Sequence, residues 1–219
     1  MGGYSSEVAI SLNSGSIVYE NLNRTKYNPY SVHILKEKWV HVDADNNEFP
    51  IDKNNFSTTV DHQKIFFDCV FNAIHGTPGE DGTILAYFDL IGMKHTSAPF
   101  YQMALTFNKR DTLSVVKKYG IQTAKSIYLN KGDAIDTSKI IDIIGLPCFI
   151  KPNNAGSSFG ISKAYSADEI ISGIEKAYTE DTAILIESFL DGTEVSVGVI
   201  EYQGNINVLP ITEITTEND

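Results

Sequence analysis

Positive charge and long apolar runs are both scarce in this chain. Its 219 residues carry 17 lysines and arginines against 28 aspartates and glutamates, a formal net charge of −11. Non-specific binding to nucleic acid or to an anionic membrane requires clustered basic residues, so we expect neither partner. No apolar run approaches the length of a membrane span, and the N-terminus lacks the pattern of a signal peptide. These absences predict a cytoplasmic protein.

Cysteine is also scarce, with two residues in the whole chain. Cys69 and Cys148 both lie in apolar stretches, 67–71 and 146–150, where a reduced cysteine behaves as a small hydrophobic residue. We therefore expect neither a structural disulfide nor a cysteine metal site. The hydrophobic content of 42% over this length is sufficient for one large domain or two modest domains with their own cores, and we expect two.

The most informative stretch, residues 145–160, is an apolar run that ends on a lysine and opens into a small polar loop. The run 146–150 is too short for a helix and suits a buried strand, which Pro152 ends, so Lys151 lies where the strand stops. The loop that follows is built from small residues: Gly156, Ser157, Ser158 and Gly160. Backbone N–H groups and hydroxyls can approach an anion closely there. The pattern favours a phosphate-binding loop, although the stretch taken alone also fits a plain strand-to-turn connection.

The segments after this loop alternate between helix and strand. Residues 166–169 resemble a capping box, and apolar residues at helical spacing follow as far as Ala177. The pattern then predicts a buried strand over 183–186 and two further strands, 194–200 and 208–211, with a turn at 203–205 between them.

The first half of the chain predicts an N-terminal open parallel α/β domain, so the fold class is α/β. A glycine-serine turn over residues 1–7 precedes loosely helical spacing from Val8 to Leu22. The remaining predicted elements are strands over 31–35, 38–42 and 65–74 and helices over 82–90 and 104–119, the last stopped by Gly120. Ligands bind at the carboxyl ends of strands in such sheets, which predicts a site in the polar cluster 75–82.

Three further charged residues suit a nucleotide. Lys109 offers a compact cation for phosphate oxygens, although a lone lysine at such a position is commonly a solvated helix residue. Glu187 follows a buried strand and could accept a hydrogen bond from an adenine amino group, and Glu194 could accept from ribose hydroxyls. Each glutamate taken singly fits a surface charge equally well.

Taken in order, these segments resemble the D-alanine–D-alanine ligase family of the ATP-grasp superfamily. The resemblance rests on Gly2-Gly3-Tyr4-Ser5-Ser6-Glu7 with Ile10-Ser11-Leu12 and Ser14-Gly15, on His75-Gly76-Thr77-Pro78-Gly79-Glu80-Asp81-Gly82, on Asn108-Lys109, on Lys151-Pro152 with Gly156-Ser157-Ser158-Phe159-Gly160, and on Glu187-Ser188-Phe189-Leu190 with Glu194. It covers essentially the whole chain, and the segment that begins at His75 is its most specific part. It implies an N-terminal α/β substrate-binding domain over 1–100, a central ATP-grasp domain over 101–200, and the start of a C-terminal ATP-grasp domain over 201–219, the α+β ATP-grasp region being incomplete.

The resemblance implies that ATP phosphorylates the carboxylate of one D-alanine and that the amine of a second D-alanine attacks the acyl phosphate. The product, D-alanyl-D-alanine, feeds peptidoglycan synthesis. The implied cofactors are ATP and Mg²⁺ or Mn²⁺, and the implied assembly is a homodimer. By position, Glu7 would bind the ammonium of the first D-alanine, His75 would lie beside its carboxylate, and Ser157 would fix the loop and orient Glu7.

The resemblance also assigns a nucleotide-binding set. Lys109, Lys151 and Ser158 would face phosphate, Glu187 and the backbone of Ser188, Phe189 and Leu190 would bind adenine, and Glu194 would bind the ribose.

The chain also departs from the family pattern at both ends. A strand is expected before Gly2, and a tyrosine-bearing loop, an arginine and the Asp/Glu/Asn metal ligands are expected beyond Asp219. We therefore expect no metal ligand within these residues, and we expect them alone not to ligate D-alanine. Two alternatives stay open: a ligase that takes D-lactate or D-serine as second substrate, and a non-catalytic ATP-binding relative.

Overall fold

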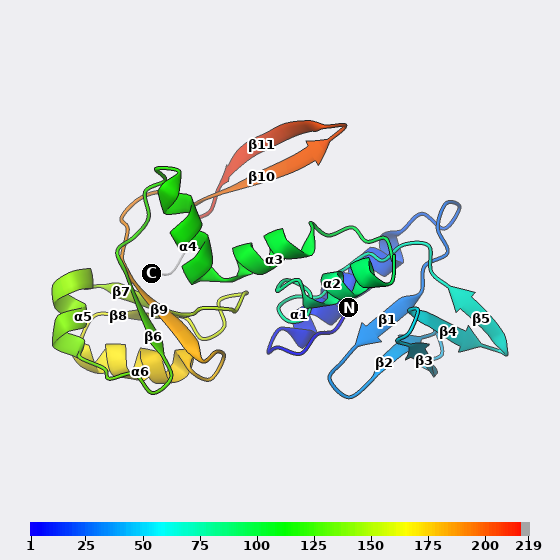
Figure 1. Cartoon of the computed structure of the whole chain (residues 1–219), viewed down its shortest axis with the longest axis horizontal. Coiled ribbons are helices and arrows are strands. Elements are labelled where there is room, and N and C mark those ends of the chain that lie inside the picture. Colours follow the sequence, from blue (N-terminus) through cyan, green and yellow to red (C-terminus); the bar gives the residue numbers. More distant parts are fainter. Residues whose placement is uncertain (216–219) are drawn as a thin grey trace. The chain divides into compact units, whose positions relative to one another are not determined.

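The computed structural model describes residues 1–215, and the chain divides into two compact units (Figure 1). The first unit is Met1–Ser188, and the second begins at Phe189. The first unit holds two separate hydrophobic clusters, one formed by residues between Ile34 and Phe88 and the other by residues between Ile140 and Ile186. No helix among residues 1–215 combines the length and apolar character that a membrane span needs.

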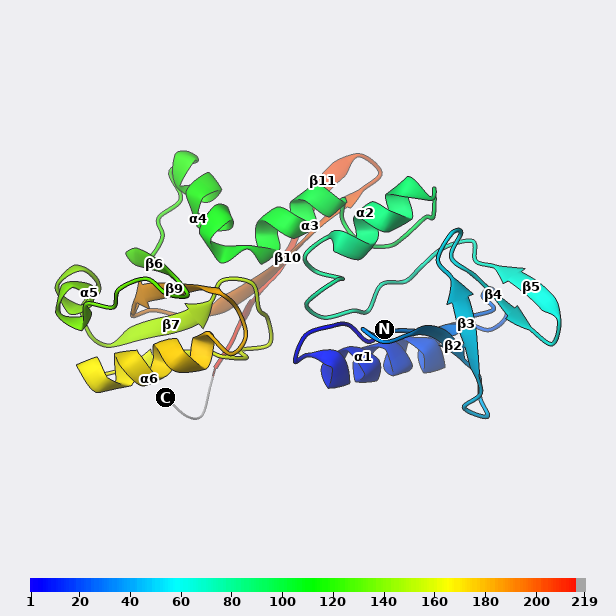
Figure 2. The ribbon, with the colours of Figure 1, turned by 60° about the horizontal axis from the view of Figure 1, so that its bottom comes forward.

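The first part of this unit is a helix followed by an antiparallel sheet. Helix α1 (Val8–Asn21) follows the N-terminal turn, residues 1–7, as predicted. The sheet has five strands, paired in chain order: β1 (Ser31–Ile34), β2 (Trp39–Val42), β3 (Glu48–Asp52), β4 (Ser57–Val60) and β5 (Gln63–Phe66). Figure 1 labels all five strands, and Figure 2 shows β2 to β5 from another side. The predicted strands 31–35 and 38–42 are confirmed. Strands β3 and β4 were not expected, because β3 is short and contains a proline, β4 is mostly serine and threonine, and both adjoin turns rich in asparagine and aspartate.

The pairing in this sheet corrects the expectation of an open parallel sheet, although the α/β class itself is confirmed. Every ladder between β1 and β5 is antiparallel. Parallel pairing within residues 1–215 occurs at two isolated bridges, Gly2 with Ile34 and Val70 with His95. The physical reason is the length of the connections: short turns close antiparallel hairpins, whereas parallel neighbours need a crossover of about a dozen residues or more.

The expected buried strand over residues 65–74 is wrong. Strand β5 ends at Phe66, whose side chain is 63% exposed at the sheet edge. Asn72 interrupts the apolar pattern and accepts a hydrogen bond from the Ile74 N–H at 3.1 Å, a local bond that competes with a ladder. Cys69 is consequently exposed, which corrects its predicted burial, whereas Cys148 is buried as expected; both are free thiols.

Three helices, α2, α3 and α4, follow this sheet in the chain. Helix α2 (Thr83–Leu90) confirms the helix predicted over 82–90. The single helix predicted over 104–119 is two helices, α3 (Phe100–Phe107) and α4 (Lys109–Lys118). Asn108 is extended between them, and its side chain accepts a hydrogen bond from the Asp111 N–H at 3.0 Å, so it caps α4. Gly120, with φ of +76°, follows the end of α4 as predicted.

A four-stranded sheet forms the second part of the first unit. It contains β6 (Ser126–Asn130), β7 (Cys148–Pro152), β8 (Ser162–Ala164) and β9 (Ala183–Ser188), in the order β6-β9-β7-β8, with all pairs antiparallel. Helices α5 (Thr137–Ile144) and α6 (Ala167–Ala177) pack against it and share its apolar core. Ser166 caps α6 by accepting the Glu169 N–H at 3.3 Å. The strands predicted at 146–150 and 183–186 and the helix after Ser166 are confirmed; β6 and α5 were not predicted.

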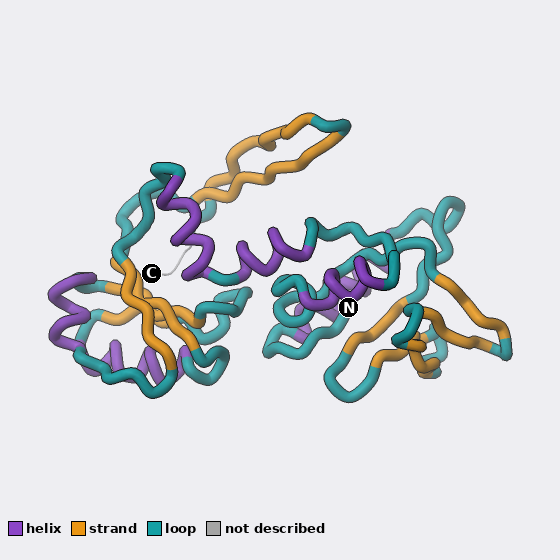
Figure 3. Tube along the Cα trace, in the orientation of Figure 1, coloured by secondary structure: helices purple, strands orange, loops and turns teal. Residues whose placement is uncertain are grey.

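The second unit is a β-hairpin, visible with its strands in orange in Figure 3. Strands β10 (Val195–Tyr202) and β11 (Asn205–Glu213) pair antiparallel, which confirms the strands predicted over 194–200 and 208–211. Gln203 and Gly204 have φ values of +52° and +75°, typical of the tight turn predicted there. The predicted domain limits at residues 100 and 200 stay predictions, and the last four residues of the predicted C-terminal domain lie outside the described residues.

Candidate active site

Glu7 lies directly before α1, and its carboxylate is held by the loop after β7. Its side chain is 2% exposed. Oε1 accepts a hydrogen bond from the Gly156 N–H at 3.3 Å, and Oε2 accepts one from the Ser157 hydroxyl at 2.5 Å. A buried carboxylate needs such partners to remain charged. Residues about 150 positions apart in the sequence therefore meet at one carboxylate, as the predicted role of Ser157 requires.

The loop that holds Glu7, residues 153–160, is called here the glycine-serine loop, and its backbone is unusual. Ser157 and Ser158 have φ values of +47° and +60°, a left-handed conformation that residues other than glycine seldom adopt. A Cβ atom on Gly156 would lie 3.0 Å from Glu7 Oε2. The close approach explains the glycine, and backbone strain of this kind is concentrated at functional sites.

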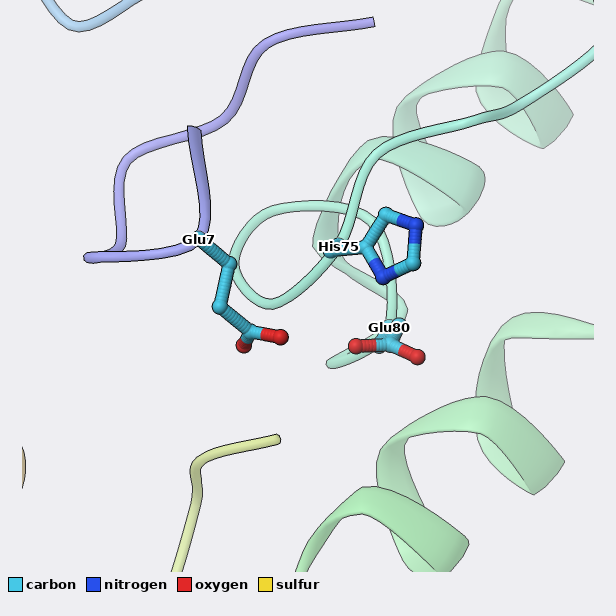
Figure 4. A group of neighbouring side chains, drawn as sticks. All are labelled: Glu7, His75 and Glu80. Atoms are coloured by element: carbon cyan, nitrogen blue, oxygen red, sulfur yellow. The ribbon is translucent and has the colours of Figure 1, made fainter. Parts of the chain in front are cut away.

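His75 and Glu80 lie beside Glu7 in Figure 4. One ligand atom from each of these three side chains lies within 4.8 Å of the others. The His75 ring is oriented by Ser14, whose hydroxyl is 3.1 Å from Nε2, and Glu80 accepts the Gly76 N–H at 2.7 Å. Within residues 1–215 this cluster has the spacing that could hold a metal ion, and its two carboxylates equally suit an organic ammonium group.

The two lysines predicted to bind phosphate both interact with protein groups. The Lys109 ammonium donates to the Ala155 carbonyl at 2.6 Å, and the Lys151 ammonium donates to Glu187 at 2.9 Å. Burial, and then the nearby charge of Lys151, lower the pKa of Lys109 below its ordinary value. The positive charge of Lys151 beside the Lys109 ammonium suits a bound anion near both lysines.

Asn153 connects the start of α4 to the end of β7. Its side chain is buried, its carbonyl oxygen accepts the Lys109 N–H at 3.2 Å, and its Oδ1 accepts the Arg110 N–H at 2.9 Å. Sequence reasoning missed this residue, since an asparagine after a proline is typical of an ordinary turn.

Sequence reasoning also gave Ser14 and Glu80 no individual role. The signal for both was their place inside the two motifs that carry Glu7 and His75.

The remaining predicted nucleotide-binding residues are placed as follows. Ser158 is exposed on the glycine-serine loop. The Ser188 side chain accepts the Lys125 N–H at 3.1 Å, so it extends the pairing between β6 and β9. Phe189, Leu190 and Glu194 belong to the second unit, where the Glu194 carbonyl accepts the Ile214 N–H at 2.9 Å. Their contacts with a nucleotide stay predictions.

Comparison with known proteins gives concordant results. Two family models match, that of the D-Ala–D-Ala ligase N-terminus over residues 1–98 and that of the C-terminus over residues 115–219. The D-alanine–D-alanine ligase of Flavobacterium johnsoniae is 67% identical over 219 residues, which are 100% of this chain and 68% of the relative.

Solved structures agree. D-alanyl-alanine synthetase A from Vibrio cholerae has a TM-score of 0.86 at 26% identity and covers 99% of this chain and 66% of that one. The VanG D-Ala:D-Ser ligase from Enterococcus faecalis has a TM-score of 0.79 at 30% identity and covers 97% of this chain and 67% of that one. The chain thus spans about two thirds of the length of these proteins. As its motifs predict, the chain belongs to the D-alanine–D-alanine ligase family.

Proposed function

We propose that this chain acts in the ATP-dependent ligation of two D-alanine molecules to D-alanyl-D-alanine, through an acyl phosphate, for cytoplasmic peptidoglycan synthesis. The observation that carries the proposal is the contact between Glu7 and the glycine-serine loop. This contact joins a buried carboxylate suited to an ammonium group to a loop suited to phosphate. A reaction that transfers phosphate to the carboxylate of an amino acid needs both sites close together.

The first D-alanine would be held by the cluster around Glu7. An ionised carboxylate offers about four acceptor positions, and Glu7 uses two of them in the contacts with Gly156 and Ser157, so positions remain for an ammonium group. Glu80 adds a second negative charge nearby. His75, oriented by Ser14, would lie beside the substrate carboxylate that becomes phosphorylated.

The nucleotide would be held by the two lysines and the adenine-binding residues. Lys109, Lys151 and the Ser158 hydroxyl would contact phosphate oxygens, and the lowered pKa of Lys109 beside Lys151 supports an anion there. Glu187, Ser188, Phe189 and Leu190 would bind adenine, and Glu194 would bind the ribose. Lys151 donates to Glu187 at 2.9 Å, and both side chains keep further hydrogen-bonding positions for the nucleotide, since an ammonium has three donors and a carboxylate about four acceptor positions.

Mg²⁺ or Mn²⁺ would neutralise the remaining triphosphate charge when bound. The Glu7, His75 and Glu80 cluster does not fit Mg²⁺, because this ion prefers an octahedron of oxygen ligands and one of the three donors is an imidazole nitrogen. We assign that cluster to the substrate ammonium and derive no step through the metal. We further propose that the enzyme is a homodimer, which sedimentation of the protein would test.

The activity test uses a fusion of residues 1–219 with the part of the Flavobacterium johnsoniae relative that this chain does not match. We expect ADP release that requires D-alanine and formation of D-alanyl-D-alanine. The matched control is Glu7→Gln in the same fusion, which keeps the size of the side chain but loses the charge that binds ammonium. It also replaces one of the two oxygens that accept from Gly156 and Ser157 with an NH2 donor.

Two outcomes would support other functions. Nucleotide binding without D-alanine-dependent ADP release would favour a non-catalytic relative. Preference for D-serine over D-alanine as second substrate would favour a D-Ala:D-Ser ligase, as the VanG protein is named.

A further inference from the structure

Ser6 and Glu180 connect the N-terminal turn to the α6–β9 turn, residues 178–182. The Ser6 hydroxyl donates to Glu180 Oε2 at 2.8 Å, across 174 positions of sequence. Both residues line a cavity of about 240 Å³, together with Glu7 and Ala155. The bond therefore lies beside the proposed substrate site, and neither residue has a role in the mechanism described above.

The position of Glu180 is not explained by helix stability. Helix α6 ends at Ala177, and the C-terminal end of a helix favours cations, so an acidic residue just beyond it gains nothing from the helix. Its side chain instead packs on the end of the glycine-serine loop, where a Cβ atom on Gly160 would lie 2.9 Å from Glu180 Cγ. Glu180 thus contacts the loop on one side and Ser6 on the other.

Asp181 holds the other end of the same loop. One of its oxygens accepts both the backbone N–H of Asn154, at 2.7 Å, and the side-chain amide of Asn154, at 2.9 Å. The α6–β9 turn therefore contacts both ends of the glycine-serine loop, and the Ser6 bond extends this support to the residue that directly precedes Glu7.

We propose that Ser6 and Glu180 are positioning residues that hold the N-terminal turn, residues 1–7, and the glycine-serine loop in place around the first substrate. The proposal rests on the proposed function of Glu7. Small displacements of a binding carboxylate reduce the fraction of productive complexes, so loss of the bond should weaken use of D-alanine more than use of ATP.

The kinetic test uses Ser6→Ala, Glu180→Ala and the double variant in the fusion protein. We expect the KM for the first D-alanine to rise about threefold to tenfold, in the range of a hydrogen bond to a partly exposed charged group. The KM for ATP should stay within about twofold, and the double variant should be no worse than the worse single variant. Ser6→Thr, which keeps the hydroxyl, should restore the wild-type value, and Glu175→Ala, an exposed glutamate of α6, is the matched control.

A second measurement keeps the proposal separate from the proposed function. Amide hydrogen exchange in the 219-residue chain should become faster over residues 153–160 in Ser6→Ala, with β7 and β9 unchanged. An active wild-type fusion with unaltered D-alanine KM in the variants would overturn the proposal, as would equal changes in both KM values. If the wild-type fusion makes no dipeptide, the proposed function fails, and unchanged exchange in the loop would then reject the Ser6–Glu180 role as well.

Discussion

At the residue scale, Ser157 makes one favourable and one unfavourable contribution to the stability of the site. Its hydroxyl bonds to Glu7 at 2.5 Å, yet its backbone is held at φ of +47°. We expect Ser157→Ala and Ser157→Gly both to weaken use of D-alanine, because both lose the hydroxyl. Ser157→Gly should be more stable than Ser157→Ala by about 1 kcal/mol, because glycine adopts this conformation without strain. Thermal unfolding of the 219-residue chain measures the difference, and equal stability would contradict the strained-backbone interpretation.

Lys109 should give nucleotide binding a distinctive dependence on pH. Burial and Lys151 lower its pKa from the ordinary 10.5, so the folded chain releases this proton at a lower pH than the unfolded chain does. The charged form of Lys109 therefore lowers the free energy of unfolding at neutral pH. This destabilisation fades as the pH rises through the lowered pKa toward 10.5.

We consequently expect the affinity for ATP to fall on the alkaline side at a lower pH than an ordinary lysine would produce. Lys109→Arg should retain affinity to higher pH, since arginine remains charged. Fluorescence titrations with a labelled nucleotide from about pH 7 to pH 10 test this. Identical pH profiles for the two proteins would show that Lys109 does not contact phosphate.

At the element scale, the sheet that carries Lys151 depends on its apolar face. Ile150 is 0% exposed and lies in the core between β7 and α6, against Gly173. Ile150→Ala should lower the free energy of unfolding by about 2–5 kcal/mol, through lost burial and the cavity left behind. Urea unfolding followed by circular dichroism measures the change. Ile143→Ala, at a residue of α5 that is 42% exposed, is the comparison and should cost far less.

The hairpin β10–β11 behaves differently from the sheet. All residues of both strands are exposed, including Val199, Ile206 and Ile211. An isolated two-stranded hairpin is marginally stable in water, so its amides in the 219-residue chain should exchange with solvent much faster than those of β7 and β9. Mass-spectrometric hydrogen exchange provides the measurement, and slow exchange in the hairpin would mean that another surface covers it.

At the scale of the whole molecule, the charge of −11 sets the range of partners. We expect no binding of the chain to a DNA duplex or to anionic vesicles even at low salt, because the long-range field repels both. Binding of ATP under the same conditions is the internal control, since we expect it to depend on the locally placed Lys109 and Lys151. Salt-sensitive DNA binding in a mobility-shift assay would contradict this prediction.

The sequence by itself determined the local elements and the family. The helix after Ser166, the strand before Lys151 and the turn at Gln203-Gly204 follow from periodicity, capping and turn residues, which act over a few positions. The motifs around Glu7, His75, Lys109 and Lys151 identified the family because residue types and their order in the chain are properties of the sequence.

Only the tertiary structure decided which elements pair and which side chains meet. The antiparallel order of β1–β5 and the exposure of Phe66 depend on packing partners that periodicity does not specify. The same holds for the Ser6–Glu180 bond and for the contacts of Asn153 with α4. An apolar pattern reports that a face is buried, but hydrogen bonds between residues more than a hundred positions apart exist only after the chain has folded.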